Sequence, residues 1–308
     1  MYNKPQNKKI NKIVSFYTAF NQNHFLKINY IIRILLIRIP EVFIVMVKEL
    51  IFLSSVTYSS KYANNFSSTI QQTYKNYYFR LMKKIVVLTG AGMSAESGIN
   101  TFRDANGLWE GHDIMKVASP QGFANNPSLV LDFYNKRRSQ LFEVTPNKAH
   151  HNLKKLEEKY SVHIVTQNVD DLHERAKSTN ILHLHGELLK ARSSATNDYV
   201  CRWEKDIKLG DLAKDGSQLR PHIVWFGEDV PMLEKAIDIT EQADILVIIG
   251  TSMQVYPAAS LINFTKQETP IYFIDPKPYV NKNAFNNLTI IKDVATSGTD
   301  ILLNMLMN

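Results

Sequence analysis

Two pairs of polar side chains have the types and the spacing for acid–base chemistry on a sugar. His183 and His185 lie two apart after a short apolar run, and an imidazole, whose pKa lies near neutrality, suits a general base. Asn168 and Asp170 lie two apart after another such run, where an amide and a carboxylate can hold a carboxamide and a ribose hydroxyl. The alternatives are a structural histidine and an Asx turn that caps the next helix, and the residue types alone do not exclude them.

A glycine-rich loop follows the apolar, β-branched run of residues 85–88. Gly90, Gly92 and Ala95 fit the spacing G-x-G-x-x-G/A of dinucleotide-binding loops, in which glycines permit a tight turn and a close approach to a pyrophosphate. The residues that follow are compatible with a helix, whose N-terminus offers N–H donors to phosphates. Such loops also follow strands in proteins that bind no nucleotide there, so the loop needs support from other motifs.

The elements that position these side chains alternate along the chain from residue 84. Short apolar strands followed by helical segments predict an α/β fold, with a Rossmann-like parallel sheet covered by helices on both faces. The expected strands are 85–88, 162–166, 181–183, 221–226, 244–249 and 271–274, and the expected helices are 129–142, 149–159, 230–241, 258–267 and 300–307. Residues 83–308 are expected to form the catalytic domain, and the segments of about 106–145 and 187–220 are candidate insertions that build a second, smaller lobe.

The charge of the chain is unevenly distributed. Residues 1–83 carry twelve Lys and Arg against two acidic residues, out of 36 basic and 29 acidic residues in all. The remaining 24 basic and 27 acidic residues give 84–308 a net charge of −3, which leaves no basic footprint for nucleic acid. The single cysteine, Cys201, excludes an internal disulfide and a cysteine-based zinc site, and it favours a reducing, cytoplasmic setting.

Residues 1–82 differ from the rest, because they are rich in Asn, Lys, Ile, Tyr and Phe and contain no glycine. Charged residues interrupt their apolar stretch, so neither a spanning helix nor a signal peptide is expected, and a membrane-surface helix is a weak alternative. We expect a leader that is either disordered or an over-extended start before Met82, and no membrane partner.

Five ordered motifs carry a resemblance to a known family. They read GINTFRD at 98–104, TQNVDDLH at 166–173, HLHGE at 183–187, PHIVWFGE at 221–228 and GTSMQVYP at 250–257. Together they resemble the sirtuins, the NAD-dependent protein-lysine deacylases, over about residues 83–307.

This resemblance implies that NAD lies in a cleft between a Rossmann-type domain and a small lobe. In the family, the acyl-amide oxygen attacks the ribose C1′ and expels nicotinamide, and a histidine base, here His185, then activates a ribose hydroxyl. Asn168 and Asp170 would position nicotinamide and the reacting ribose, Phe102 would shield the sugar from water, and Arg103 would meet phosphate. The implied cofactor-binding residues are Gly90, Ala91, Gly92, Ser94, Ala95, Phe102, Arg103, Trp109, Gln167, Asn168, Asp170, Gly250, Thr251, Ser252, Asp275 and Ala295.

The same resemblance implies acylated lysine proteins or peptides as partners. The segment 221–228 would bind the peptide as an added strand, with Val224 and Phe226 lining the acyl tunnel and Gly227 and Glu228 beside them. A plain core strand is the alternative for Ile223 and Trp225.

Tyr134 and Arg137 bear on the choice of acyl group. They lie three apart, hence on one helix face, like the Tyr-x-x-Arg pair of sirtuins that prefer succinyl- and malonyl-lysine. A guanidinium can grip the acyl carboxylate in bidentate fashion while the tyrosine hydroxyl adds a third bond. The alternative is a solvated basic helix face, as expected for Lys136 and Arg138.

Two positions depart from the family pattern. Most sirtuins bind structural zinc through two cysteine pairs, but residues 191–198 read ARSSATND and the second pair is missing, so we expect no zinc. The lobe would then be held by packing, through Tyr199, Trp203 and Leu212. Asp275 stands where asparagine is usual, and because a carboxylate accepts from both ribose hydroxyls and repels a 2′-phosphate, NAD remains the expected cofactor.

The sequence therefore predicts an NAD-dependent deacylase that removes acetyl groups, and also succinyl and malonyl groups, from protein lysines. A mono-ADP-ribosyltransferase is the main alternative, since it uses the same C1′ electrophile with a different nucleophile. A nicotinamide oxidoreductase and a non-catalytic NAD sensor are further alternatives, and the set His185, Asn168 and Asp170 disfavours both.

Overall fold

The computed structural model describes residues 82–100, 108–109, 111–196, 199–280 and 285–307. The chain divides into two units, Met1–Arg80 and Leu81–Asn308, and all the described residues belong to the second. The expected leader, residues 1–82, therefore lies outside the described residues except for Met82.

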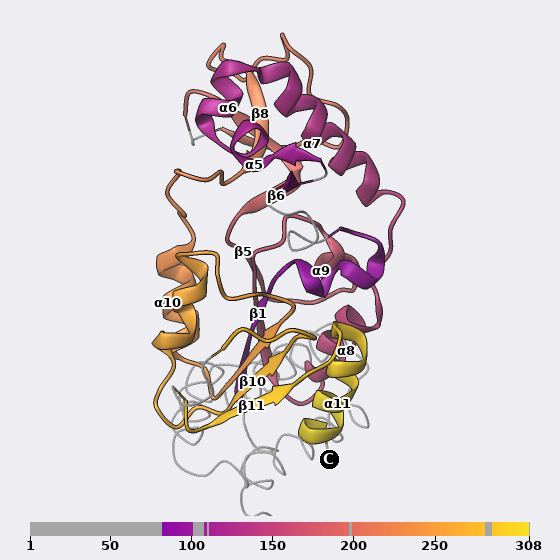
Figure 1. The fold of residues 1–308 in the computed structure, drawn as a ribbon, viewed down its shortest axis with the longest axis vertical. Helices are drawn as coiled ribbons and strands as arrows, with labels where there is room; N and C mark the ends of the chain where they lie inside the picture. The colour runs from indigo at the N-terminus through magenta and orange to yellow at the C-terminus, as the bar shows by residue number, and fades with distance from the viewer. Residues whose placement is uncertain (1–81, 101–107, 110, 197–198, 281–284, 308) are drawn as a thin grey trace, which may run out of the picture. The chain divides into compact units, whose positions relative to one another are not determined.

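A six-stranded parallel sheet forms the centre of the first group of elements (Figure 1). Its order is β11-β10-β9-β1-β4-β5, so the chain runs outward from β1 to β5 and later returns to β9 on the other side of β1. The carboxyl ends of β1, β4 and β9 therefore meet where the strand order reverses, which is where open α/β sheets bind their ligands. The strands are β1 (Lys84–Thr89), β4 (Ser161–Thr166), β5 (Ile181–His183), β9 (Ile245–Ile249), β10 (Ile271–Ile274) and β11 (Leu288–Ile291).

Alternation along β1 sends its side chains into two separate cores. Ile85 and Val87 pack in the cluster that includes side chains of α8 and α11, whereas Val86 and Leu88 pack in the cluster that includes α10 and the 3₁₀ helix Ala258–Phe264. Because both faces are covered, the strand must be apolar throughout, and the predicted α/β fold is confirmed. The helices are α8 (Lys148–Leu156), α10 (Leu233–Glu241) and α11 (Ala295–Met307).

A second group of elements lies at the top of Figure 1, in magenta and orange. Three helices and the antiparallel sheet β7-β6-β8 pack around Phe133, Tyr134, Leu188 and Trp225. The elements are β2 (Leu108–Trp109), β3 (His112–Asp113), α5 (Ile114–Val117), α6 (Pro120–Asn125), α7 (Pro127–Leu141), β6 (Gly186–Ser193), β7 (Val200–Arg202) and β8 (Leu219–Ile223). A further short helix, α9 (Leu172–Arg175), follows the loop after β4.

Several element predictions are wrong in detail. The glycine loop leads into two 3₁₀ turns, Ala91–Met93 and Ala95–Ser97, instead of an α-helix, and Gly98 ends the second with a φ of 97°. The strand expected at 221–226 is β8, which ends at Ile223, and the helix expected at 258–267 is a 3₁₀ helix. No helix in the described part of the chain is both long and apolar enough to cross a membrane.

Candidate active site

The loops that follow β1 and β9 pack backbone against backbone. The Gly92 N–H donates to the Gly250 carbonyl at 2.8 Å, and a Cβ added to Gly92 would lie 2.7 Å from the Gly250 Cα. A Cβ on Gly90 would lie 2.7 Å from the Thr251 Cβ. Gly90 has an extended backbone with a φ of −125°, so it is required by this close approach and not by the tight turn that its spacing predicts.

Three buried polar side chains meet beside this pair of loops. The Ser94 hydroxyl donates to Asp170 Oδ2 at 2.9 Å and accepts from Asn168 Nδ2 at 3.1 Å. Asp170 Oδ1 also accepts from the Leu172 N–H, so the Asx turn considered from the sequence is present as well. Burial raises the pKa of Asp170, and the hydrogen bonds from Leu172 and Ser94 oppose that rise. An amide, a carboxylate and a hydroxyl therefore converge at the ends of neighbouring strands.

His185 is the last residue of the two-residue connection from β5 to β6, and its ring is oriented by one backbone contact. Its Nδ1 lies 3.1 Å from the Gln167 carbonyl oxygen, which can only accept, so Nδ1 carries the hydrogen and Nε2 keeps a lone pair. Burial lowers the pKa of His185, and the hydrogen bond to Gln167 opposes this only in part. At neutral pH the ring is therefore a neutral base.

His183 has the opposite surroundings. Its Nδ1 faces the Asn168 carbonyl oxygen at 3.1 Å, and its Nε2 faces Glu174 Oε1 at 2.8 Å. Burial lowers the pKa of His183, but the hydrogen bond and the charge of Glu174 outweigh it, so the net shift is upward. The structure thus separates two histidines that the sequence pattern left equivalent.

The remaining cofactor candidates follow the same sheet edge or lie apart from it. Gln167 Nε2 donates to Thr251 Oγ1 at 3.2 Å and so joins the loops after β4 and β9. Asp275, buried after β10, accepts the Lys277 N–H at 2.7 Å. Trp109 packs with the second group of elements, with its ring 4.9 Å from that of Phe133. Ala91 and Ala95 begin the two 3₁₀ turns, Ser252 is half-buried after β9, Ala295 is buried at the start of α11, and Phe102 and Arg103 lie outside the described residues.

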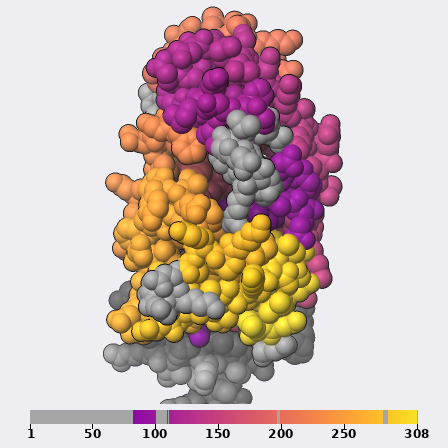
Figure 2. Space-filling model, viewed as in Figure 1, coloured from indigo at the N-terminus to yellow at the C-terminus, as the bar shows by residue number. Residues whose placement is uncertain are grey.

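The face of the molecule seen in Figure 2 is hollowed between the two groups of elements, beside the orange segment that contains α10. Strand β8 borders the described sheet β7-β6-β8, and the residue after it, Val224, donates its N–H to the His185 carbonyl at 2.9 Å. Phe226 is 42% exposed and Gly227 is exposed. A backbone hydrogen bond therefore joins the predicted peptide-binding segment 221–228 directly to His185, the candidate base.

Glu228 lies at the end of this segment, with its carboxylate turned inward. Oε1 accepts from Arg192 at 2.9 Å and from Arg220 at 2.6 Å, while Oε2 accepts the Trp225 N–H at 2.7 Å. The Arg220 guanidinium lies 3.2 Å from the centre of the Trp225 ring. Nothing in the sequence pattern pointed to these two buried arginines, which hold the turn that follows β8.

Tyr134 and Arg137 both lie on α7, but their side chains have different neighbours. Tyr134 is fully buried, and its hydroxyl oxygen accepts from Trp225 Nε1 at 3.0 Å, while burial raises its pKa. The Arg137 guanidinium lies 3.8 Å from the centre of the Phe133 ring and donates to the Phe133 carbonyl. It lines a cavity of about 270 Å³ together with His112, Lys136 and Gln140.

A hydroxyl–carboxylate cluster joins the end of β6 to the segment before β8. The Ser193 hydroxyl donates to Asp215 Oδ2 at 2.6 Å, lies 2.7 Å from the Ser217 hydroxyl, and accepts the Ala195 N–H at 3.0 Å. The side-chain oxygens of this cluster do not match the four thiolates of the zinc site that the resemblance implies for most sirtuins.

We expect Ser193→Ala to lower the free energy of unfolding by about 1 kcal/mol, because it removes the hydrogen bonds that the buried Ser193 hydroxyl makes with Asp215 and Ser217. Urea unfolding of the purified chain measures this. Ser194→Ala is the matched control, since Ser194 is the exposed neighbour. Equal unfolding free energies for the two variants would show that the cluster does not hold the lobe.

Comparison with known proteins agrees with this architecture. Residues 90–257 match the Sir2 family. A protein of Helicobacter pylori named NAD-dependent protein deacylase is 61% identical over 228 residues, which cover 73% of this chain and 98% of that protein. A solved complex of a Sir2 homologue with NAD is 38% identical, with a TM-score of 0.66 over 77% of this chain and 93% of that one. A Sir2 protein solved with a deacetylated p53 peptide and 3′-O-acetyl-ADP-ribose is 27% identical, with a TM-score of 0.61 over 77% and 98% of the two chains. The chain therefore belongs to the Sir2 family, the sirtuins that its five motifs resemble.

Proposed function

We propose that this protein is an NAD-dependent protein-lysine deacylase in which His185 is the general base. The observation that carries the proposal is the hydrogen bond from His185 Nδ1 to the Gln167 carbonyl. It leaves Nε2 with a lone pair in the segment next to the cluster of Ser94, Asn168 and Asp170. The name of the Helicobacter pylori relative supports the same activity.

The described residues fit NAD by their chemistry. Gly90 and Gly92 let the loops after β1 and β9 pack closely against each other. The half-buried backbone of residues 91–92 would then approach the pyrophosphate. Asp170 and Asn168 would hold the reacting ribose and the nicotinamide carboxamide, and Asp275 would accept from the adenosine ribose. When bound, NAD supplies a ribose carbon that an acyl-amide oxygen can attack, with nicotinamide as the leaving group. His185 would accept, at its Nε2, the proton of the ribose hydroxyl that takes up the acyl group, while water supplies the second acyl oxygen and the lysine leaves as the free amine.

The acylated lysine would enter along β8. Strand β8 lies at the border of the described sheet, where a peptide can bind as an added strand. Main-chain hydrogen bonds would then supply the affinity. Val224 and Phe226, which follow this strand, would line the acyl tunnel. The inward hydrogen bonds of Glu228 support a role for this residue in holding the segment for the substrate. The Sir2 protein solved with a deacetylated peptide supports a peptide substrate.

The acyl group would include succinyl and malonyl as well as acetyl. Tyr134 accepts from Trp225 Nε1, so its own hydroxyl hydrogen remains to be donated, and Arg137 on the same helix supplies a positive charge. Burial keeps the phenol protonated, since it raises the Tyr134 pKa.

We expect Arg137→Met to lower kcat/KM for a succinyl-lysine peptide by about tenfold or more relative to an acetyl-lysine peptide, since a hydrogen bond to a charged group contributes about 1.5 to 3 kcal/mol. Competition between the two peptides, followed by mass spectrometry, measures the ratio. Lys136→Met is the matched control, because Lys136 lines the same cavity from the exposed side of α7. An unchanged ratio in Arg137→Met would contradict the assignment of an acidic acyl group.

We infer further that the lobe does without zinc and that the enzyme acts in a reducing, cytoplasmic setting, as the single cysteine supports. The proposed activity is tested by incubation with NAD and a panel of acyl-lysine peptides, read by mass spectrometry. Free lysine together with O-acyl-ADP-ribose supports a deacylase. ADP-ribose attached to the acceptor, with the acyl group retained, would instead identify a mono-ADP-ribosyltransferase.

A further inference from the structure

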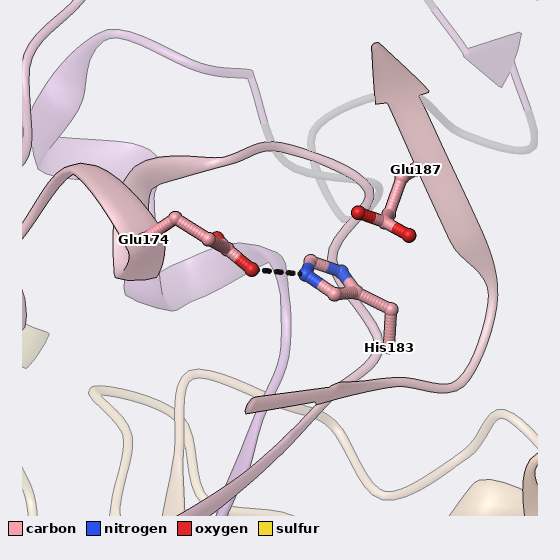
Figure 3. A group of neighbouring side chains, drawn as sticks. All are labelled: Glu174, His183 and Glu187. Atoms are coloured by element: carbon pink, nitrogen blue, oxygen red, sulfur yellow. Dashed lines mark hydrogen bonds and ion pairs between the residues drawn. The ribbon is translucent and has the colours of Figure 1, made fainter. Parts of the chain in front are cut away.

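His183 takes no part in the proposed chemistry, yet it makes two directed contacts next to the site. Figure 3 shows the ring between two carboxylates, with Glu174 of α9 on one side and Glu187 of β6 on the other. Glu174 Oε1 lies 2.8 Å from Nε2, and on the opposite side of the ring the Asn168 carbonyl oxygen lies 3.1 Å from Nδ1.

These contacts determine the protonation of the ring. A carbonyl oxygen and an ionised carboxylate oxygen only accept hydrogen bonds, so both ring nitrogens must donate and the ring is an imidazolium. The charged groups around it agree with this. Glu187 and Glu174 both favour the charged ring, and the pKa of Glu174 is lowered because the hydrogen bond and the charge of His183 outweigh its burial. Lys190 pairs with Glu187 at 2.5 Å, and His173, buried nearby, has a pKa that burial lowers well below its ordinary value.

We propose that His183 is a positioning residue: as an imidazolium held by Glu174, it donates to the Asn168 carbonyl and fixes the loop that carries Gln167, Asn168 and Asp170. This inference rests on the proposed function of that loop in holding NAD. The histidines of the 183–187 segment hold two consecutive carbonyls, since His185 holds that of Gln167 and His183 that of Asn168. His185 stays neutral and keeps a lone pair, whereas Glu174 makes His183 a cation.

The positive charge has a second consequence for Asp170. Burial raises the pKa of Asp170, and His183 is among the groups that oppose the rise. A neutral His183 would therefore favour protonation of the carboxylate that is proposed to hold the ribose. Loss of the positive charge on His183 would therefore loosen the loop 167–170 and also weaken Asp170 as a hydrogen-bond acceptor.

The sign of the pH dependence follows from the direction of the shift. Because the folded state raises the pKa of His183 above 6.5, the contact is complete below that value and is lost as the pH rises through the raised pKa. The pKa of His185 is lowered, so this ring has already lost its proton, and can act as a base, at a pH below that at which His183 loses its own. The kcat/KM for NAD should therefore rise with the deprotonation of His185 and fall with the deprotonation of His183.

The experiment combines an NMR titration with kinetics on Glu174→Gln, His183→Gln and the control Glu158→Gln, an exposed glutamate after α8. In the unliganded protein, the His183 resonance, assigned from its loss in His183→Gln, should titrate above 6.5, and in Glu174→Gln it should titrate at lower pH. We expect kcat/KM for NAD, measured at a pH between the His183 pKa of Glu174→Gln and that of the wild type, to fall by about 10- to 100-fold in both variants, in line with the cost of misplaced binding groups. At lower pH the activity of Glu174→Gln should recover towards wild type, whereas that of His183→Gln should not.

Three outcomes would overturn the proposal. One is a His183 that titrates below 6.5 in the wild type, and another is a Glu174→Gln variant whose pH profile matches that of the control. The third is a divalent cation retained in equimolar amount by the wild type and lost in His183→Gln, because Glu174, His183 and Glu187 have ligand atoms within 4.8 Å of one another. If the wild type released no nicotinamide with any acyl-peptide, the proposed function would fail, while the titration would still decide the charge of His183.

Discussion

Replacing His185 with alanine lowers kcat for acyl-lysine removal by about 10²- to 10⁴-fold, the usual contribution of a positioned general base. The Kd for NAD changes little, because the ring is held by a carbonyl of the NAD loop but is proposed to touch only the ribose hydroxyl. Isothermal titration with NAD and initial rates with an acetyl-lysine peptide measure the two quantities separately.

The pH dependence of the wild type provides a second test of the same residue. Because burial lowers the pKa of His185, the enzyme keeps its base below pH 6.5 and loses activity only when the pH falls through that lowered pKa. The matched control is His163→Ala, a half-buried histidine on β4 whose pKa is also lowered by burial and whose Nε2 contacts Ser161. A loss of kcat in the control equal to that in His185→Ala would show that the effect comes from weakened packing.

Gly186→Ala is expected to destabilise the protein by about 3 kcal/mol or more, through a steric clash and backbone strain. Gly186 has a φ of 85°, and a Cβ there would lie 2.0 Å from the His222 carbonyl oxygen. The contact is with backbone of the neighbouring strand β8, so no side-chain rotation relieves it. Since Gly186 directly follows His185, the surviving folded protein should also lose activity.

Gly210→Ala separates the two causes. Gly210 has a φ of 92°, and an added Cβ would meet nothing within 4 Å, so this variant carries the backbone strain alone, about 1 kcal/mol. Urea unfolding of both variants gives the difference. If Gly186→Ala lowered the free energy of unfolding by no more than Gly210→Ala, the close backbone contact between β6 and β8 would be contradicted.

The parallel sheet could be predicted from the sequence because buried parallel strands are apolar throughout. The runs 85–88 and 245–249 carry this signal, and once they are strands, their carboxyl ends must meet. Because the carboxyl ends of neighbouring parallel strands meet, Asn168 and Asp170 are expected to lie close to the glycine loop.

The second group of elements was harder to predict, because its strands depend on partners distant in the chain. Strand β6 mixes polar and apolar residues and is defined by antiparallel pairing with β8, which lies some thirty residues later. The turn after β8 likewise depends on Arg192 and Arg220, and the cost of burying these two guanidinium groups is offset in part by their ion pairs with Glu228.

The roles of the two histidines illustrate the same limit. Their spacing places them near one another, but it cannot show that one faces a carbonyl alone while the other also faces Glu174. Protonation state follows from these contacts, so it becomes visible only in three dimensions.

The most direct test of the account is a single-turnover experiment on His185→Ala with NAD and an acetyl-lysine peptide, in which nicotinamide and O-acetyl-ADP-ribose are quantified from the same samples. If His185 acts after nicotinamide has left, the variant releases nicotinamide but forms O-acetyl-ADP-ribose at least about 100-fold more slowly than the wild type. Formation of O-acetyl-ADP-ribose by the variant at the wild-type rate would contradict the account.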